Sequence, residues 1–172
     1  MRKYKRKKIL SFSALVFILL TYLFNHFFIK QEGIFSPYGK QTISGYAEII
    51  DGDTIKIYNN RIRLKGIDAP ELQQTCEKSG HKYFCGKESK SYLEKMTKNK
   101  IVTCDWQARD KYHRILGTCF VDDIIINRQM VLSGQAVNYY DYPREQKIAK
   151  EEKRGIWAGK FMRPQNWRRI NK

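Results

Sequence analysis

The chain has 172 residues, enough for one domain of ordinary size with a short appendage and too few for two large domains. A hydrophobic fraction of 42%, with only 11 glycines and 4 prolines, excludes a largely disordered or collagen-like chain. The formal net charge is +16, from 33 basic and 17 acidic residues, so we expect a phosphate polymer or an anionic lipid surface as partner.

The N-terminal end predicts a membrane segment. Residues 1–8 carry six basic side chains and should stay cytoplasmic, and residues 9–29 form an uncharged, mostly apolar run that would span roughly 30 Å as a helix. We interpret this run as a transmembrane signal anchor that places the rest of the chain outside the cytoplasm. The alternative is secretion after cleavage of a signal peptide, although no A-x-A cleavage pattern lies near residue 30.

The folded domain is predicted to follow a linker. Residues 30–42 mix Gly, Ser, Pro and polar residues without periodicity, which is typical of a linker, and residues 43–170 form the predicted domain. At its start, residues 46–50 and 54–58 are rich in β-branched and aromatic residues. They flank an Asp-Gly-Asp turn at 51–53, and this pattern predicts a β-hairpin.

The pattern of the remaining elements predicts the fold class. Residues 61–65 alternate between basic and apolar side chains, which is typical of a strand with one face in the core. The elements expected after it are a helix at 86–97, strands at 101–106 and 115–121, a short helix at 127–132 that Asn127 caps and Gly134 ends, and a charged helix at 145–154. This order predicts an α+β domain whose strands close a small five-stranded barrel of the OB-fold type, with about three helices.

The four cysteines agree with an extracytoplasmic address. They form an even set without a C-x-x-C pair, so a zinc site is disfavoured, and outside the cytoplasm they can oxidise. Cys104 and Cys119 lie in two predicted neighbouring strands, where a cross-strand disulfide is geometrically reasonable. Cys76 and Cys85 would then close the loop between them. The alternative is four free buried thiols.

Four carboxylates lie at the ends of predicted strands. Asp51 and Asp53 belong to the hairpin turn, and Asp68 and Glu71 follow the third strand. If that strand returns alongside the hairpin, Asp68 comes near Asp53, and two close carboxylates favour Ca²⁺ or Mg²⁺ between them. Glu71, beyond the rigid Pro70, could act as a general base toward a nearby water. Alternatively, these Asp and Pro residues serve only as turn formers.

Two arginines add to this pattern of charged residues. Arg63 is on the polar side of the third strand, and Arg114 follows the polar segment 110–113 and leads into the last predicted strand. A guanidinium group binds two phosphate oxygens at once with fixed geometry. Two such groups and a divalent ion would stabilise the extra negative charge that develops in phosphodiester hydrolysis. Each arginine taken singly is more typical of a solvated surface.

Three segments together resemble the staphylococcal nuclease (thermonuclease) family. They are DGDT at 51–54, RLKGIDAPE at 63–71 and DKYHR at 110–114, and their order, spacing and residue types agree. The resemblance covers about residues 43–167 and implies the OB-fold core. It also implies the pairing of Cys76 with Cys85 and of Cys104 with Cys119, as in secreted and membrane-anchored bacterial relatives.

The resemblance implies a role for each matching residue. Asp53, Asp68 and the backbone carbonyl of Ala69 are expected to bind calcium, although other divalent ions also suit such ligands, and Asp51 lies behind them. Arg63 and Arg114 are expected to bind the scissile phosphate, and Glu71 to activate water. The residues expected at the nucleotide are Lys111, Tyr112, Tyr140 and Tyr142, and a partly buried aromatic packing cluster is the alternative for the tyrosine region 139–142.

Two departures from the founding member are visible. Ala69 replaces a threonine, and since the main-chain oxygen is the ligand, we expect metal binding to survive. The loop 73–86 carries two cysteines in place of a lysine-rich segment, so substrate access could differ. The C-terminal GIWAG segment at 155–159 and Trp167 are interpreted as structural, holding the last helix against the barrel.

Two classes of function follow from these features. The favoured hypothesis is a monomeric, metal-dependent endonuclease that cleaves DNA and RNA with little sequence preference and leaves 3′-phosphate ends. The alternative is a membrane-tethered nucleic-acid-binding module that has the barrel but no activity. The complete set of carboxylates and arginines favours the enzyme, because binding alone does not require it. A basic surface that only holds anionic lipid would not explain the acidic cluster.

Overall fold

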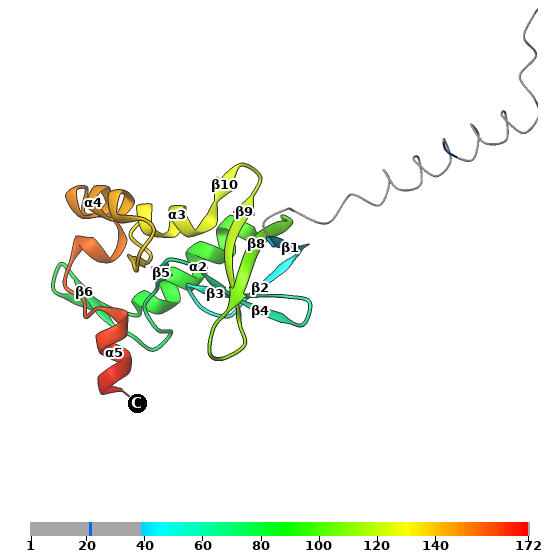
Figure 1. The fold of residues 1–172 in the computed structure, drawn as a ribbon. Helices are drawn as coiled ribbons and strands as arrows, with labels where there is room; N and C mark the ends of the chain where they lie inside the picture. Colours follow the sequence, from blue (N-terminus) through cyan, green and yellow to red (C-terminus); the bar gives the residue numbers. More distant parts are fainter. Residues whose placement is uncertain (1–20, 22–38, 172) are drawn as a thin grey trace, which may run out of the picture. The chain divides into compact units, whose positions relative to one another are not determined.

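The computed structural model of the chain describes Thr21 and residues 39–171, and the part from Lys40 onward forms one compact unit. The predicted membrane segment 9–29 lies outside the described residues apart from Thr21. Among the described residues, no helix has the length and apolar character needed to cross a bilayer. The folded unit combines a curled sheet with helices packed at its side (Figure 1).

The main sheet is a curled half-barrel in the order β1-β8-β9-β4-β3-β2, with β10 paired to β9. Its strands are β1 (Gln41–Gly45), β2 (Ala47–Ile49), β3 (Thr54–Ile57), β4 (Asn60–Leu64), β8 (Val102–Arg109), β9 (Ile115–Val121) and β10 (Ile124–Ile125). All pairs are antiparallel except β4 with β9, which run parallel. The predicted α+β class is confirmed, and the sheet is compatible with an OB-like fold.

The sheet contains two strands more than predicted. β1 lies partly in the predicted linker, and its partner β8 is far along the chain, so no local turn signal marks the pairing. β10 is a two-residue strand that turns back on β9. Two short pairs lie outside the sheet: β5 (Ile67–Asp68) with β11 (Val137–Asn138), and β6 (Cys76–Lys78) with β7 (His81–Tyr83).

Four α-helices occur in the described part, one more than predicted. They are α2 (Cys85–Thr97), α3 (Ile126–Leu132), α4 (Pro143–Glu151) and α5 (Pro164–Ile170), and a 3₁₀ turn spans Gly155–Ala158. Gly134 follows α3 with a φ of +70°, the left-handed conformation predicted for a helix end. The predicted cap was wrong: the residue before the helix is Ile125, and Asn127 lies in the first turn with its side chain buried.

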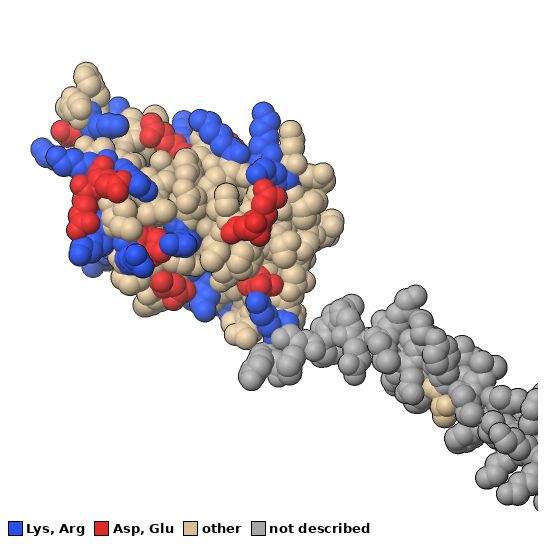
Figure 2. Space-filling model, turned by 90° about the horizontal axis from the view of Figure 1, so that it is seen from above, with Lys and Arg blue, Asp and Glu red and all other residues tan. Residues whose placement is uncertain are grey.

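The core lies between the concave face of the sheet and helices α2 and α3. β9 buries alternate residues along its whole length, as a strand with one face in a core must. Fully buried aliphatic side chains such as Ile62, Leu93 and Ile115 each stabilise the fold by about 1.5–3 kcal/mol. On the face shown in Figure 2, Lys and Arg side chains lie beside Asp and Glu rather than forming one continuous basic patch.

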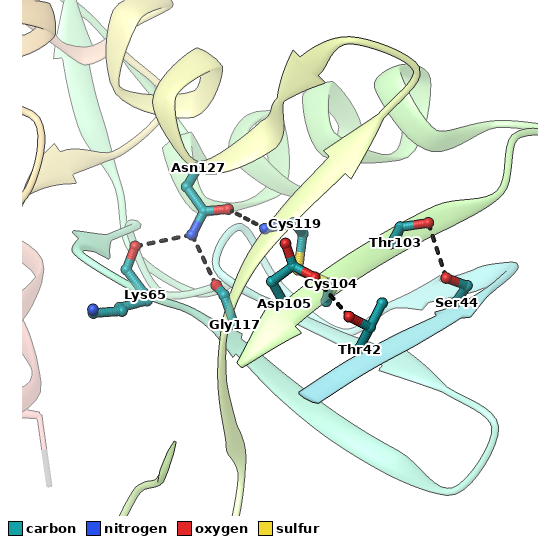
Figure 3. The surroundings of a disulfide bond; sticks show 9 residues. All are labelled: Thr42, Ser44, Lys65, Thr103, Cys104, Asp105, Gly117, Cys119 and Asn127. Atoms are coloured by element: carbon teal, nitrogen blue, oxygen red, sulfur yellow. Dashed lines mark hydrogen bonds between the residues drawn. A yellow bond between two sulfur atoms is a disulfide. The ribbon is translucent and has the colours of Figure 1, made fainter. Parts of the chain in front are cut away.

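Both predicted disulfides are present. Cys104 and Cys119 lie directly opposite each other on β8 and β9, inside the core (Figure 3). By the loop-closure estimate, a bridge across 15 residues stabilises the fold by about 3 kcal/mol. The second bridge joins Cys76 on β6 to Cys85 at the start of α2, and so ties the small β6–β7 hairpin to that helix.

Candidate functional site

The ends of several strands meet at one place on the sheet. Asp53 comes directly before β3, and its backbone N–H donates to the Asp51 carboxylate at 3.0 Å, which closes the tight turn. Asp68 ends β5, which follows a turn that needs a φ of +80° at Gly66. Arg63 lies on β4, the strand between them in sequence. The turn geometry therefore brings the two aspartates toward one arginine.

Arg63 joins the two aspartates. Its Nη1 lies 2.7 Å from Asp53 Oδ1, and its Nη2 lies 3.0 Å from Asp68 Oδ1. Both carboxylates are buried, and the arginine side chain is 21% exposed. Burial lowers the pKa of Arg63, but the neighbouring carboxylates outweigh this effect and raise it overall. The three residues thus form a compact charged cluster, as the predicted return of the third strand required.

Asp53 is a buried carboxylate with several hydrogen-bond donors around it. Besides Arg63, its oxygens accept hydrogen bonds from the Ala69 backbone N–H at 2.9 Å and the Thr54 hydroxyl at 3.1 Å. Burial raises its pKa to about 7, against the charge of Arg63, which lowers it. Near neutral pH, the Asp53 carboxyl group is therefore only partly ionised when no metal is bound.

This raised pKa predicts a pH dependence of stability. Because the pKa of Asp53 in the folded state exceeds its ordinary value of 3.8, its contribution to stability is fully present below about pH 4 and is lost as pH rises through 7. We expect the free energy of unfolding, relative to Asp53→Asn, to fall between pH 4 and pH 8 in the presence of a chelator. Urea denaturation at a series of pH values measures this difference, and a flat difference would contradict the raised pKa.

Glu71 lies at the edge of the same site. Its loop packs tightly on the start of α2. A Cβ added to Gly86 would lie 1.8 Å from the Glu71 carbonyl oxygen, so only glycine fits at position 86. The Glu71 carboxylate forms an ion pair with Arg168 of α5, at 2.8 Å from Nη1. Sequence reasoning missed Arg168. Burial lowers the pKa of Arg168, but its hydrogen bonds to Asp68 and Glu71 raise it overall.

Arg114 reaches the site from the loop before β9. Asp110 holds its guanidinium through one oxygen, which lies 2.8 Å from Nε and 2.7 Å from Nη2. The other oxygen of Asp110 accepts the backbone N–H groups of Tyr112 and Arg114. Burial raises the pKa of Asp110, but the hydrogen bonds from Arg114 and Tyr112 lower it by a larger amount, so the pKa is lowered overall. The loop therefore presents Arg114 in a fixed orientation.

These groups line one open cavity of about 660 Å³. The predicted site residues among its lining are Asp51, Asp53, Arg63, Asp68, Ala69, Glu71, Lys111, Tyr112 and Arg114. Tyr140 and Tyr142 are not among the lining residues: Tyr140 is 72% exposed, and Tyr142 packs against the core. Their neighbour Tyr139 lines the cavity instead, together with Arg61, Gln165 and Arg168.

The site offers few side-chain ligands for a metal ion. Within residues 39–171 there is no group of three or more His, Cys, Asp or Glu side chains that could hold one. Asp53 and Asp68 supply two carboxylates joined to one arginine, and Ala69 is the residue after Asp68. Two carboxylates and a backbone carbonyl fit a hard cation such as Ca²⁺, which takes oxygen ligands and completes its shell with water.

Comparison with known proteins gives a consistent result. The family described as "Staphylococcal nuclease homologue" matches residues 61–159. The "Succinoglycan biosynthesis protein ExoI" of Rhizobium meliloti is 41% identical over 125 residues, and an "Uncharacterized endonuclease" of Escherichia coli is 35% identical over 121 residues. The matches cover 68% and 64% of the present chain, and 65% and 73% of these relatives.

A plant protein shows the same similarity in a longer chain. The rice (Oryza sativa subsp. japonica) protein named "Probable staphylococcal-like nuclease CAN1" is 33% identical over 135 residues, or 73% of the present chain. That match spans only 38% of the rice protein, and the match to the rhizobial protein spans 65% of the rhizobial chain. The present chain therefore spans less than two thirds of the length of these two relatives.

Proposed function

Because the chain belongs to the staphylococcal nuclease family, we propose that it is a metal-dependent endonuclease that hydrolyses phosphodiester bonds of DNA and RNA. The observation that carries this proposal is the cluster at the cavity, in which Arg63 lies within 3.0 Å of both Asp53 and Asp68. Glu71 and Arg114 line the same cavity. A site that only bound nucleic acid would need basic groups but not three carboxylates beside them.

Each group of the cavity has chemistry that suits this reaction. Arg63 and Arg114 carry planar guanidinium groups, which bind two oxygens of one phosphate and stabilise the charge that develops on it. Glu71, with its carboxylate 34% exposed, would accept a proton from the attacking water. A divalent ion, which we propose to be Ca²⁺ held by Asp53, Asp68 and the Ala69 carbonyl, would offset the phosphate charge when bound.

The proposed specificity follows from the same contacts, and the proposed products follow from the family resemblance. Phosphate and metal contacts carry no base information, so we propose cleavage with little sequence preference. Attack that breaks the bond to the 5′ oxygen leaves 3′-phosphate ends. Lys111 and the exposed Tyr112 lie at the rim of the cavity, where they would contact the neighbouring nucleotide. The nucleotide-binding roles of Tyr140 and Tyr142 stay predictions.

We also propose that the nuclease works outside the cytoplasm as a monomer. Two disulfides support this location, because such bonds persist in oxidising compartments. The uncharged run at residues 9–29 supports attachment to the membrane, with secretion after cleavage as the alternative. The mass of the mature chain, isolated from its host, separates an intact N-terminus from a cleaved one.

Digestion of nucleic acid under metal control tests the proposal. The purified full chain is expected to degrade single-stranded DNA and RNA with Ca²⁺, to lose essentially all activity in excess chelator, and to recover when Ca²⁺ is restored. End-labelled fragments report whether the phosphate stays on the 3′ end. Undiminished cleavage in chelator would reject the metal dependence. DNA binding without any cleavage would instead support the alternative of a non-catalytic binding module.

A further inference from the structure

The C-terminal helix α5 delivers a charged side chain into the cavity that the sequence did not single out. Arg168 lies 100 residues after Asp68 in the chain, yet its guanidinium contacts this aspartate through both terminal nitrogens, at 2.9 and 3.1 Å. The same Nη1 is 2.8 Å from Glu71 Oε1. One guanidinium therefore bridges the carboxylate proposed to bind metal and the carboxylate proposed to act as base.

Glu71 depends on this arginine for its orientation. In the described part of the chain, the pair with Arg168 is the only ion pair that Glu71 makes, whereas Asp68 is also paired with Arg63. A carboxylate at the end of a flexible side chain, about one third exposed, samples many rotamers unless a partner restrains it. Loss of Arg168 would therefore free Glu71 and leave Asp68 still paired.

The position of α5 is fixed by the loop that carries Glu71. Gln74 is fully buried, and its Nε2 donates to the Met162 carbonyl at 2.6 Å, two residues before α5 begins. The Gln74 Oε1 accepts a hydrogen bond from the Glu71 backbone N–H at 3.3 Å, and the Gln74 backbone N–H donates to the Glu71 carbonyl at 2.7 Å. The Glu71 loop and the chain entering α5 are thus joined through one buried side chain.

A second attachment holds the same segments together. Glu77 on β6 and Lys160 exchange two backbone hydrogen bonds, each of 2.8 Å, as in a short antiparallel bridge. β6 is in turn held to α2 by the disulfide between Cys76 and Cys85. The segment that leads to Arg168 is therefore anchored by backbone contacts, so the arginine is brought to the cavity by the fold and not by a loose surface chain.

We propose that Arg168 is a positioning residue of the nuclease: its guanidinium group, itself held by two contacts with Asp68, holds the Glu71 carboxylate toward the cavity through Nη1. The inference rests on the proposed function, since it gives Arg168 a role through the base of that reaction. A misplacement of a reacting group by about 1 Å can slow a reaction about a hundredfold, so restraining Glu71 affects turnover more than substrate binding. Direct contact of Arg168 with a substrate phosphate is the competing role.

A double-mutant cycle separates the two roles. The full chain is prepared as wild type, Arg168→Gln, Glu71→Gln and the double variant, and kcat and KM are measured on single-stranded DNA with Ca²⁺. Arg168→Gln is expected to lower kcat by about tenfold to a hundredfold with KM within about twofold. The double variant should be no slower than Glu71→Gln alone, because the two residues act as one unit.

Two further variants control for charge and for folding. Arg169→Gln removes the exposed neighbouring charge on the same helix and should leave kcat and KM within about twofold of wild type. Arg168→Lys keeps the charge without the planar group and should restore only part of the lost kcat. A double variant slower than Glu71→Gln by the full factor seen for Arg168→Gln would overturn the positioning role, and so would a rise in KM with unchanged kcat.

Urea denaturation of the same four proteins tests the Arg168–Glu71 contact without an activity measurement. If the side chains contact each other, the shift in urea midpoint of the double variant, relative to wild type, should differ from the sum of the shifts of the two single variants. Additive midpoints would overturn the contact and with it the inference. A folded wild-type chain that digests no nucleic acid, with non-additive midpoints, would overturn the proposed function while the Arg168–Glu71 contact stood.

Discussion

Replacing Arg63 by lysine is expected to lower the turnover of single-stranded DNA by about a hundredfold or more, as loss of a transition-state donor generally does. Two carboxylates hold the guanidinium in place, with Nη1 2.7 Å from Asp53 and Nη2 3.0 Å from Asp68. Lysine keeps the charge, but its single ammonium cannot contact both carboxylates and a phosphate with fixed geometry. Arg114→Lys is expected to behave in the same way.

The control is an arginine whose ion pair lies away from the cavity. Arg128 pairs with Glu145 at 2.7 Å, the same length as the pair of Arg63, and neither Arg128 nor Glu145 lines the cavity. Arg128→Lys should retain turnover within threefold of wild type. Urea midpoints of all three variants show whether each is folded under the assay conditions. A loss of turnover below threefold for Arg63→Lys would remove this arginine from the catalytic set.

Replacing Asn127 by alanine is expected to destabilise the fold by about 3 kcal/mol, because it removes three hydrogen bonds to backbone groups and leaves the buried N–H of Cys119 without this acceptor. The Asn127 side chain accepts the N–H of Cys119 at 2.9 Å and donates to the carbonyls of Lys65 and Gly117 at 2.9 and 3.0 Å (Figure 3). It therefore ties the first turn of α3 to β9 and to the end of β4. The free energy of unfolding in urea measures the loss.

An exposed asparagine provides the comparison. Asn166 on α5 faces solvent, so Asn166→Ala should change the free energy of unfolding by no more than about 0.5 kcal/mol. If Asn127→Ala proved equally mild, water would have to satisfy the orphaned backbone groups. The proposed tie between α3 and the sheet would then contribute little to stability.

Much of the sheet was predictable because its signals are local. Alternation of basic and apolar residues predicted β4, the Asp-Gly-Asp turn predicted the hairpin of β2 and β3, and the two cysteine-bearing runs predicted β8 and β9. The convergence of Asp53, Asp68 and Arg63 followed from the same strands, since each residue lies at or near the end of one. Both disulfide pairings expected from the family resemblance are present.

The features that sequence reasoning missed depend on contacts between distant segments. β1 was not predicted as a strand, and its first two residues were assigned to the linker, because this short polar run pairs only with the distant β8. Nothing in the sequence distinguishes Arg168 from its neighbour Arg169, and its partners Asp68 and Glu71 come about a hundred residues earlier. Asn127 has the residue type of a helix cap, but its side chain faces the core instead.

The parallel pairing of β4 with β9 has a consequence for how activity arises. The hairpin β2–β3 and the pair β8–β9 are local in sequence, so each can form early. The pairing of Ile62 on β4 with Ile115 on β9 forms only after a long loop has closed. Only then do Arg63, on β4, and Arg114, just before β9, come together. Arg168 comes later still in the chain. A polypeptide still emerging from the ribosome therefore cannot yet bring these three arginines together at one cavity.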